Sequence, residues 1–270
     1  MSRSLSTPAL PTSGTPRAFR ELAYWLYRYR RTWRGTVVIS VANPLLFLTG
    51  IGAGLGTLVN HNNSAYLHGL SYLSFLAPGL LAATAMQTAY VDASMAVHQS
   101  VRTRGNYRAA AATPMSPADI YHGHLLFNVL KGALSSVAFT AVAVAFGAVD
   151  VARAPLLVLA GVLVSLAFCA PIAAWAVTVD RSSKILGLLR FGIMPLFMFS
   201  GTFFPIAQLP GWLQVAAEVT PLWHAIELCR TVALGTATAS GAAVHIGYLA
   251  LMAAAGVAAG RRTHRRHLHS

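Results

Sequence analysis

The chain has 270 residues, of which 56% are hydrophobic and only 10% are charged, against about 25% charged in an ordinary soluble domain. The formal net charge is +13, but a nucleic-acid-binding face needs charge-rich soluble elements, and the basic residues here lie at the ends of apolar stretches. The composition therefore predicts a membrane protein that associates with membrane lipids, including anionic ones, and excludes nucleic acid as a partner.

Six apolar stretches are each long enough to cross a bilayer, and the basic residues fall almost entirely in alternate gaps between them. Only Arg153 and Arg230 lie in the other gaps. Because Lys and Arg are retained on the cytoplasmic side during insertion, this alternation predicts six membrane-spanning helices in the inner (plasma) membrane, with both termini in the cytoplasm. The residues that set this orientation are Arg3, Arg17, Arg20, Arg28, Arg30, Arg31, Arg34, Arg102, Arg104, Arg108, Arg181, Lys184, Arg190, Arg261, Arg262, Arg265 and Arg266.

Residues 1–16 are rich in Ser, Thr and Pro and are predicted to form a disordered cytoplasmic tail without a signal peptide. Residues 17–34 show helical periodicity, with an aromatic and aliphatic stripe opposite the arginines. This pattern predicts an amphipathic helix lying in the membrane interface, and packing of the same helix on the protein itself is the alternative. The stripe consists of Phe19, Leu22, Leu26, Tyr29 and Trp33.

An all-α transmembrane domain of six helices is predicted over residues 35–260, followed by a basic cytoplasmic tail at residues 261–270. In the first span, glycines four residues apart, such as Gly50 and Gly54, favour close helix packing and not nucleotide binding. The six spans are predicted at residues 36–59, 71–97, 119–149, 154–179, 185–204 and 239–259.

Residues 205–236 are too apolar for a solvated loop, yet Pro205, Pro210 and Pro221 interrupt them. The helical parts, at residues 211–218 and 222–234, are each too short to cross a bilayer. Because non-helical backbone at membrane depth is tolerated only against protein or a polar cavity, this segment is predicted to be a re-entrant helical pair that dips from the outer face.

Three stretches of the sequence resemble one family of membrane proteins. They are Phe75-Leu-Ala-Pro-Gly-Leu-Leu-Ala-Ala-Thr-Ala-Met86; Thr113-Pro-Met-Ser-Pro-Ala-Asp-Ile120 with Gly123 beyond it; and Phe199-Ser-Gly-Thr-Phe-Phe-Pro205, followed by Leu209-Pro-Gly-Trp-Leu-Gln214 and Pro221-Leu-Trp-His224. With the six-span order, these stretches resemble the ABC-2 type export permeases over residues 17–260. The likeness is greatest to the branch that contains nodulation lipo-oligosaccharide exporters and daunorubicin-type drug exporters.

The resemblance implies a permease that pairs with a second permease copy, as a homodimer or heterodimer, and with separate ATP-binding subunits. It implies export of an amphipathic or lipid-linked cargo, such as a glycolipid, a lipo-oligosaccharide or a hydrophobic drug. In the family, the segment between spans two and three is a coupling helix that docks on the ATP-hydrolysing subunit. Here that segment carries Arg102, Arg104, Tyr107, Arg108 and Pro114, and Arg108 stands where many members have an acidic residue.

Four residues in or near the spans are candidates for a gate or a transport pathway. Burying charge in lipid is expensive, so Asp92 suggests a structural ion pair or gate, with Arg102 or Arg104 as its partner, unless it reaches headgroup water. Lys131 lies deep in the third span, where it lines the route of an anionic cargo, joins an internal pair or snorkels to the interface. Phe203 and Phe204 suggest an apolar constriction at the outer mouth, with anchoring in the interface as the alternative.

No catalytic pattern is present in the sequence. It lacks a phosphate-binding loop, so ATP and Mg are expected on the partner subunit, and this chain is expected to bind no cofactor and no metal. A Gly-x-Ser-x-Gly nucleophile elbow is also missing. A membrane-embedded lipid-modifying enzyme and a non-transporting membrane scaffold remain as alternatives to a transporter permease.

Overall fold

The computed structural model describes residues 17–55 and 70–268, and all the regular elements in these two ranges are helical. The first range holds α1 (Arg17–Tyr29), α2 (Trp33–Phe47) and the π-helix η1 (Leu48–Leu55). The long helices of the second range are α4 (Tyr72–Arg102), α6 (Pro117–Ala145), α7 (Ala154–Ala176) and α12 (Ala239–Leu268). The shorter ones are α5 (Asn106–Ala111), η2 (Val151–Arg153), α8 (Ser182–Leu188), η3 (Leu189–Ile193), α9 (Met194–Phe199), η4 (Ile206–Gln208), α10 (Gly211–Glu218) and α11 (Pro221–Leu234).

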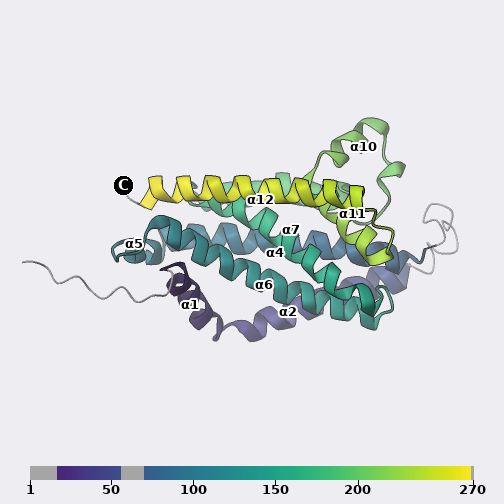
Figure 1. The fold of residues 1–270 in the computed structure, drawn as a ribbon, viewed down its shortest axis with the longest axis horizontal. Coiled ribbons are helices and arrows are strands. Elements are labelled where there is room, and N and C mark those ends of the chain that lie inside the picture. Colours follow the sequence, from purple (N-terminus) through teal and green to yellow (C-terminus); the bar gives the residue numbers. More distant parts are fainter. Residues whose placement is uncertain (1–16, 56–69, 269–270) are drawn as a thin grey trace, which may run out of the picture.

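The bundle is built around α7, which packs against α4, α6 and α12, and these helices run along the long axis of the molecule (Figure 1). Small residues allow two of them to approach closely. A side-chain carbon added at Gly132 of α6 would overlap Ser165 of α7, and one added at Gly161 of α7 would approach Ser136 of α6. Such contacts between small residues are the usual means of helix association within a membrane.

Five helical segments are long and apolar enough to cross a membrane: Trp33–Ile51, Pro117–Ala145, Val151–Ala176, Ser182–Phe199 and Ala239–Leu268. The remaining predicted span falls on α4, which is 31 residues long but carries polar side chains such as Gln87 and Asp92 along its apolar sequence. Most of α4 is buried by its neighbours. The structure therefore supports an all-helical membrane protein, while the count of six remains a prediction.

Several predicted boundaries shift. The first predicted helix ends at Tyr29, and Trp33 already belongs to α2. The fifth span ends at Phe199 because the chain turns at Gly201, whose φ of 88° favours glycine. The basic tail is helical to Leu268 because α12 continues through it. The predicted disordered tail, the last residues of the first span and the chain's last two residues lie outside the described ranges.

The segment after Phe199 divides into helices as predicted. Proline opens α11 at Pro221, where its missing N–H costs nothing, and the hydroxyl of Thr220 accepts a hydrogen bond from the Trp223 N–H at 3.3 Å. Helix α11 packs on α4, whereas α10 projects from the bundle and exposes Trp212 and Val215 (Figure 1).

Candidate coupling site and membrane pathway

The predicted coupling segment is a short exposed turn of helix at one end of the bundle. It leaves α4 through Gly105, whose φ of 66° lies in the left-handed region, and it forms α5 before α6 begins. Four of its five predicted residues, Arg102, Arg104, Arg108 and Pro114, are exposed. Partial burial, and then the charge of Arg28, lower the pKa of Arg104. The segment thus presents a basic outer surface.

The fifth predicted residue, Tyr107, is different because it is completely buried. Its hydroxyl forms a hydrogen bond with Nδ1 of His124 on α6, and burial raises its pKa well above the ordinary value. A side chain with no exposed surface cannot touch a partner protein that docks on this face. Tyr107 therefore anchors α5 to the bundle, and the exposed residues around it are the ones available for docking.

Tyr107 lies in a cluster that we call the aromatic socket, in which four helices meet. Trp25 of α1 stacks on His124 with ring centroids 4.0 Å apart and an interplanar angle of 9°. On the other side, the ring of His264 in α12 lies 4.8 Å from Tyr121 of α6 and 6.0 Å from Tyr107. The socket (Trp25, Tyr107, Tyr121, His124 and His264) links α1, α5, α6 and α12 in one packed unit.

Helix α1 is held against α6 and does not stand apart from the protein. Its buried face consists of Glu21, Leu22 and Trp25, so only Leu22 of the predicted stripe is buried, while Phe19 and Leu26 remain exposed. Close approach is possible at Gly123, where an added side-chain carbon would overlap Glu21. Glu21 accepts a hydrogen bond from Nε1 of Trp25 at 2.8 Å, and burial raises its pKa to about 7. A carboxyl group at this junction is thus partly neutral near physiological pH.

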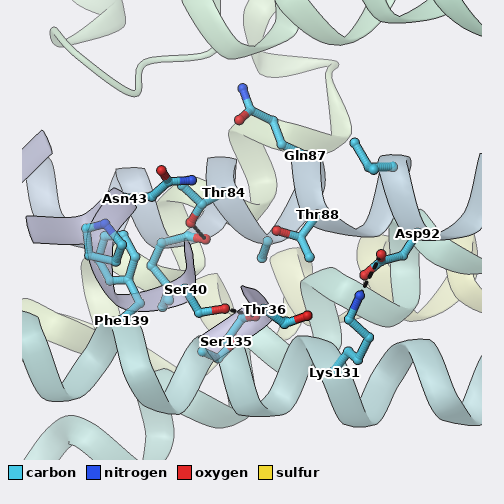
Figure 2. A pocket seen from close by; sticks show the side chains of 15 residues that line it. Thr36, Ser40, Asn43, Thr84, Gln87, Thr88, Asp92, Lys131, Ser135 and Phe139 are labelled. Atoms are coloured by element: carbon cyan, nitrogen blue, oxygen red, sulfur yellow. Dashed lines mark hydrogen bonds and ion pairs between the residues drawn. The ribbon is translucent and has the colours of Figure 1, made fainter. Parts of the chain in front are cut away.

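Asp92 and Lys131 form an ion pair between α4 and α6, with Nζ and Oδ1 2.7 Å apart (Figure 2). Both side chains are largely buried, at 20% and 15% exposed. The expectation that Arg102 or Arg104 pairs with Asp92 is wrong: Arg102 donates a hydrogen bond to the Val179 carbonyl at 3.4 Å instead. The reason is the rotation of α4, which turns Asp92 toward α6 and away from the coupling segment.

The ion pair lies at the end of a polar cavity of about 330 Å³ between α2, α4 and α6 (Figure 2). Its wall carries hydroxyl and amide groups from α2, α4 and α6, and Ser40 and Ser135 form a hydrogen bond across it at 3.0 Å. A second cavity of about 150 Å³ begins on the other side of Asp92 and Lys131 and reaches the aromatic socket at Trp25. The pair therefore lies between two cavities, and the smaller one is beside the coupling end. The uncharged polar residues of the larger cavity are Thr36, Ser40, Asn43, Thr84, Gln87, Thr88, Ser135 and Ser136.

The two phenylalanines predicted to form a constriction follow α9. The ring of Phe203 packs edge-on against Phe197, with centroids 5.1 Å apart, and its carbonyl accepts a hydrogen bond from the Tyr72 hydroxyl at 3.0 Å. Phe204 is half-buried beside it. Both residues lie beyond the end of α9 and not within the span as predicted, and the gating role remains a prediction.

Sequence reasoning missed the role of Arg230, which is 9% exposed and joins three elements. Its guanidinium pairs with Glu227 at 2.6 Å, donates to the Gly201 carbonyl at 2.8 Å and lies 4.0 Å from the centroid of the Phe75 ring. The only signal in the sequence was that Arg230 lies outside the gaps between apolar stretches in which most of the basic residues are found. Within the described residues, no three of His, Cys, Asp or Glu come together as a metal site.

Five helical segments long and apolar enough to cross a membrane define an integral membrane protein, and the family comparison gives its class. Residues 22–234 match the model of the ABC-2 type transporter membrane family, and the chain belongs to that family.

Among characterised relatives, the chain is 28% identical to nodulation protein J of Rhizobium meliloti (strain 1021) over 90% of this chain and 88% of the relative. It is 30% identical to nodulation protein J of Rhizobium leguminosarum bv. trifolii over 78% of this chain and 81% of the relative. It is 26% identical to the inner membrane transport permease YadH of Escherichia coli (strain K12) over 78% of this chain and 80% of the relative.

Proposed function

We propose that this chain is the membrane-spanning subunit of an ABC exporter, which moves an amphipathic or lipid-linked cargo out of the cell. The energy comes from ATP bound and hydrolysed by a separate subunit, and two permease copies face each other. The observation that carries the proposal is the division of the coupling segment into an exposed basic surface and one buried anchor, Tyr107. Membership of the ABC-2 type family supports it.

The proposed topology has six spans, of which α4 is the second. The protein lies in the inner membrane of the cell, with both termini in the cytoplasm. Helix α4 suits this role because most of its residues are buried by other helices and its one acidic side chain, Asp92, is paired with Lys131. The segment from α10 to α11 would then enter the membrane from the outer face and return.

In this mechanism the exposed arginines of the coupling segment dock on the ATP-binding subunit. A movement of that subunit is passed through Tyr107 to His124 and Trp25, since a packed cluster moves as a unit and does not deform. Because α1, α6 and α12 meet in the aromatic socket, the displacement is passed to all three helices. ATP can drive this change only by binding the two states of the partner with different affinity.

We further propose that the polar cavity handles the polar part of the cargo. Its hydroxyl and amide groups lie at membrane depth, where a headgroup would otherwise meet only hydrocarbon. The Asp92–Lys131 pair closes the passage between this cavity and the smaller one at the coupling end, and Phe203 with Phe204 closes the outer mouth. The cargo candidates are a glycolipid, a lipo-oligosaccharide and a hydrophobic drug.

The first test is co-purification of the tagged, full-length chain from native membranes. A subunit with a nucleotide-binding motif should be recovered with it, and repeated recovery of the permease without such a subunit would refute the proposal. Arg108→Glu reverses a charge on the exposed docking surface and should release the subunit. Arg17→Glu, which changes an equally exposed arginine on α1, is the matched control and should retain it.

The second test separates docking from transmission. Tyr107→Phe keeps the buried ring and removes the hydrogen bond to His124, so the subunit should still co-purify while the stimulation of its ATPase activity by the permease falls. Loss of docking in Tyr107→Phe would contradict the separation of docking from transmission. Normal ATPase stimulation would show that the hydrogen bond to His124 does not transmit the movement.

A further inference from the structure

A cavity of about 570 Å³ lies where the N-terminus of α6 meets the last turns of α12. Arg261, Arg262 and Arg265 line it from α12, and Pro117 and Ala118 line it from α6. The apolar part of α12 ends directly before Arg261, so the cavity sits at the edge of the membrane. It is separate from the polar cavity and from the aromatic socket.

The arginines of this cavity have no acidic partner among the residues that the structure describes. Within residues 17–55 and 70–268, none of the ion pairs involves Arg261, Arg262 or Arg265. The nearest acidic residue of α6, Asp119, is turned back to cap its own helix, where it accepts hydrogen bonds from the N–H (3.0 Å) and hydroxyl (2.7 Å) of Ser116.

Like charges one turn apart on a helix repel each other, as Arg261 and Arg265 do, so a bound anion would relieve this repulsion. Guanidinium groups bind phosphate through paired, charge-assisted hydrogen bonds. The apolar wall formed by Pro117, Ala118 and Ala258 gives no partner to a free, fully hydrated phosphate, but it suits the glycerol and first methylene groups of a lipid. The position at the membrane edge favours the same source.

We propose that this cavity is a binding site for the phosphate headgroup of an anionic phospholipid. The lipid holds the N-terminus of α6 against α12 at the end of the bundle where α5 begins. This site does not depend on the cargo or on ATP coupling, so its test is independent of the exporter proposal.

The test uses the delipidated full-length chain in detergent, with lipid binding measured by native mass spectrometry. The probes are phosphatidylglycerol, phosphatidylcholine with the same acyl chains, and glycerol 3-phosphate as a soluble headgroup. Arg265→Gln should weaken phosphatidylglycerol binding about fivefold, and Arg261→Gln with Arg265→Gln about 25-fold. Arg266→Gln, one position along the same exposed helix but outside the cavity, should change it less than twofold.

A second variant keeps every arginine. Ala118→Glu places a carboxylate in the cavity, where it pairs with the guanidinium groups and excludes the lipid, and a glutamate in the first turn suits the helix. It should abolish the preference for phosphatidylglycerol over phosphatidylcholine while the protein stays folded.

Several results would overturn the proposal. Equal effects of Arg265→Gln and Arg266→Gln would indicate diffuse attraction instead of a site. Binding of glycerol 3-phosphate as tight as that of phosphatidylglycerol would indicate a site for small anions. Unchanged lipid affinity together with release of a co-purified ATP-binding subunit would make the cluster a protein-docking surface.

Discussion

Glu21 should make the docking of α1 sensitive to pH, and Glu21→Gln should remove that sensitivity. Burial raises the pKa of this carboxyl group from its ordinary 4.5 to about 7, so the folded protein holds the proton over a pH range in which the unfolded chain has released it. The stabilisation is complete below pH 4.5 and is lost as the pH rises to about 7 and beyond. Each of the roughly 2.5 pH units between these two pKa values is worth about 1.4 kcal/mol, so the full loss is about 3.5 kcal/mol.

The measurement is thermal unfolding in detergent at pH 5 and pH 8. About 2.5 kcal/mol of this is lost between pH 5 and pH 8, so the wild-type Tm should fall by roughly 5–10 °C over this interval from the carboxyl group alone. Glu21→Gln keeps the acceptor for Trp25 Nε1 and carries no charge, so most of this fall should disappear. The matched control is Glu218→Gln, which changes an exposed carboxylate on α10 and should preserve the wild-type fall. An equal fall in Glu21→Gln and wild type would refute the reasoning.

Two further predictions concern packing and charge inside the bundle, and thermal unfolding measures both. Gly260→Ala adds a carbon that overlaps the buried ring of Tyr121 and should destabilise the protein by about 1–3 kcal/mol. Gly247→Ala is the control, because this glycine lies on the same helix with no atom within 4 Å and its replacement should not destabilise the protein. Equal Tm values for the two variants would contradict the close approach of α12 to Tyr121. Lys131→Met leaves the Asp92 carboxylate unpaired and should cost about 3 kcal/mol, and adding Asp92→Asn should restore most of that loss. A double variant as unstable as the single one would mean that the pair is not the stabilising contact.

Local signals in the sequence were sufficient to place most helices. Helices α10 and α11 begin within a residue of the predicted starts. Pro210 is the N-cap of α10, and Pro221 is the first residue of α11, where a proline needs no N–H partner. The alternation of apolar and basic segments likewise located the long helices. The end of α9 was missed by five residues, since the turn at Gly201 is stabilised by Arg230, which lies 29 positions further along the chain.

Pairings between helices were not predictable in the same way. Asp92 and Lys131 are 39 positions apart, and their contact depends on how α4 and α6 are rotated about their axes. Apolar periodicity does not fix that rotation, because both helices are apolar over most of their circumference. The burial of Tyr107 was hidden for a related reason. Helix α5 has only six residues, and the side chains that pack on Tyr107 come from α6 and α12.

The two arginines that break the charge alternation explain how the segment from α10 to α11 is held. Arg153 donates a hydrogen bond to the Ala233 carbonyl at 3.1 Å and lies against Gly235, whose φ of 70° ends α11 and leaves no room for a side chain. Arg230, about one turn before the end of the same helix, donates to the Gly201 carbonyl at 2.8 Å. A guanidinium bound to protein carbonyls does not need lipid phosphates, so neither residue contributes to orientation as a free arginine would. Arg153 and Arg230 thus both hold α11, which is more buried than α10. By fixing α11 they also fix the position from which the exposed α10 projects.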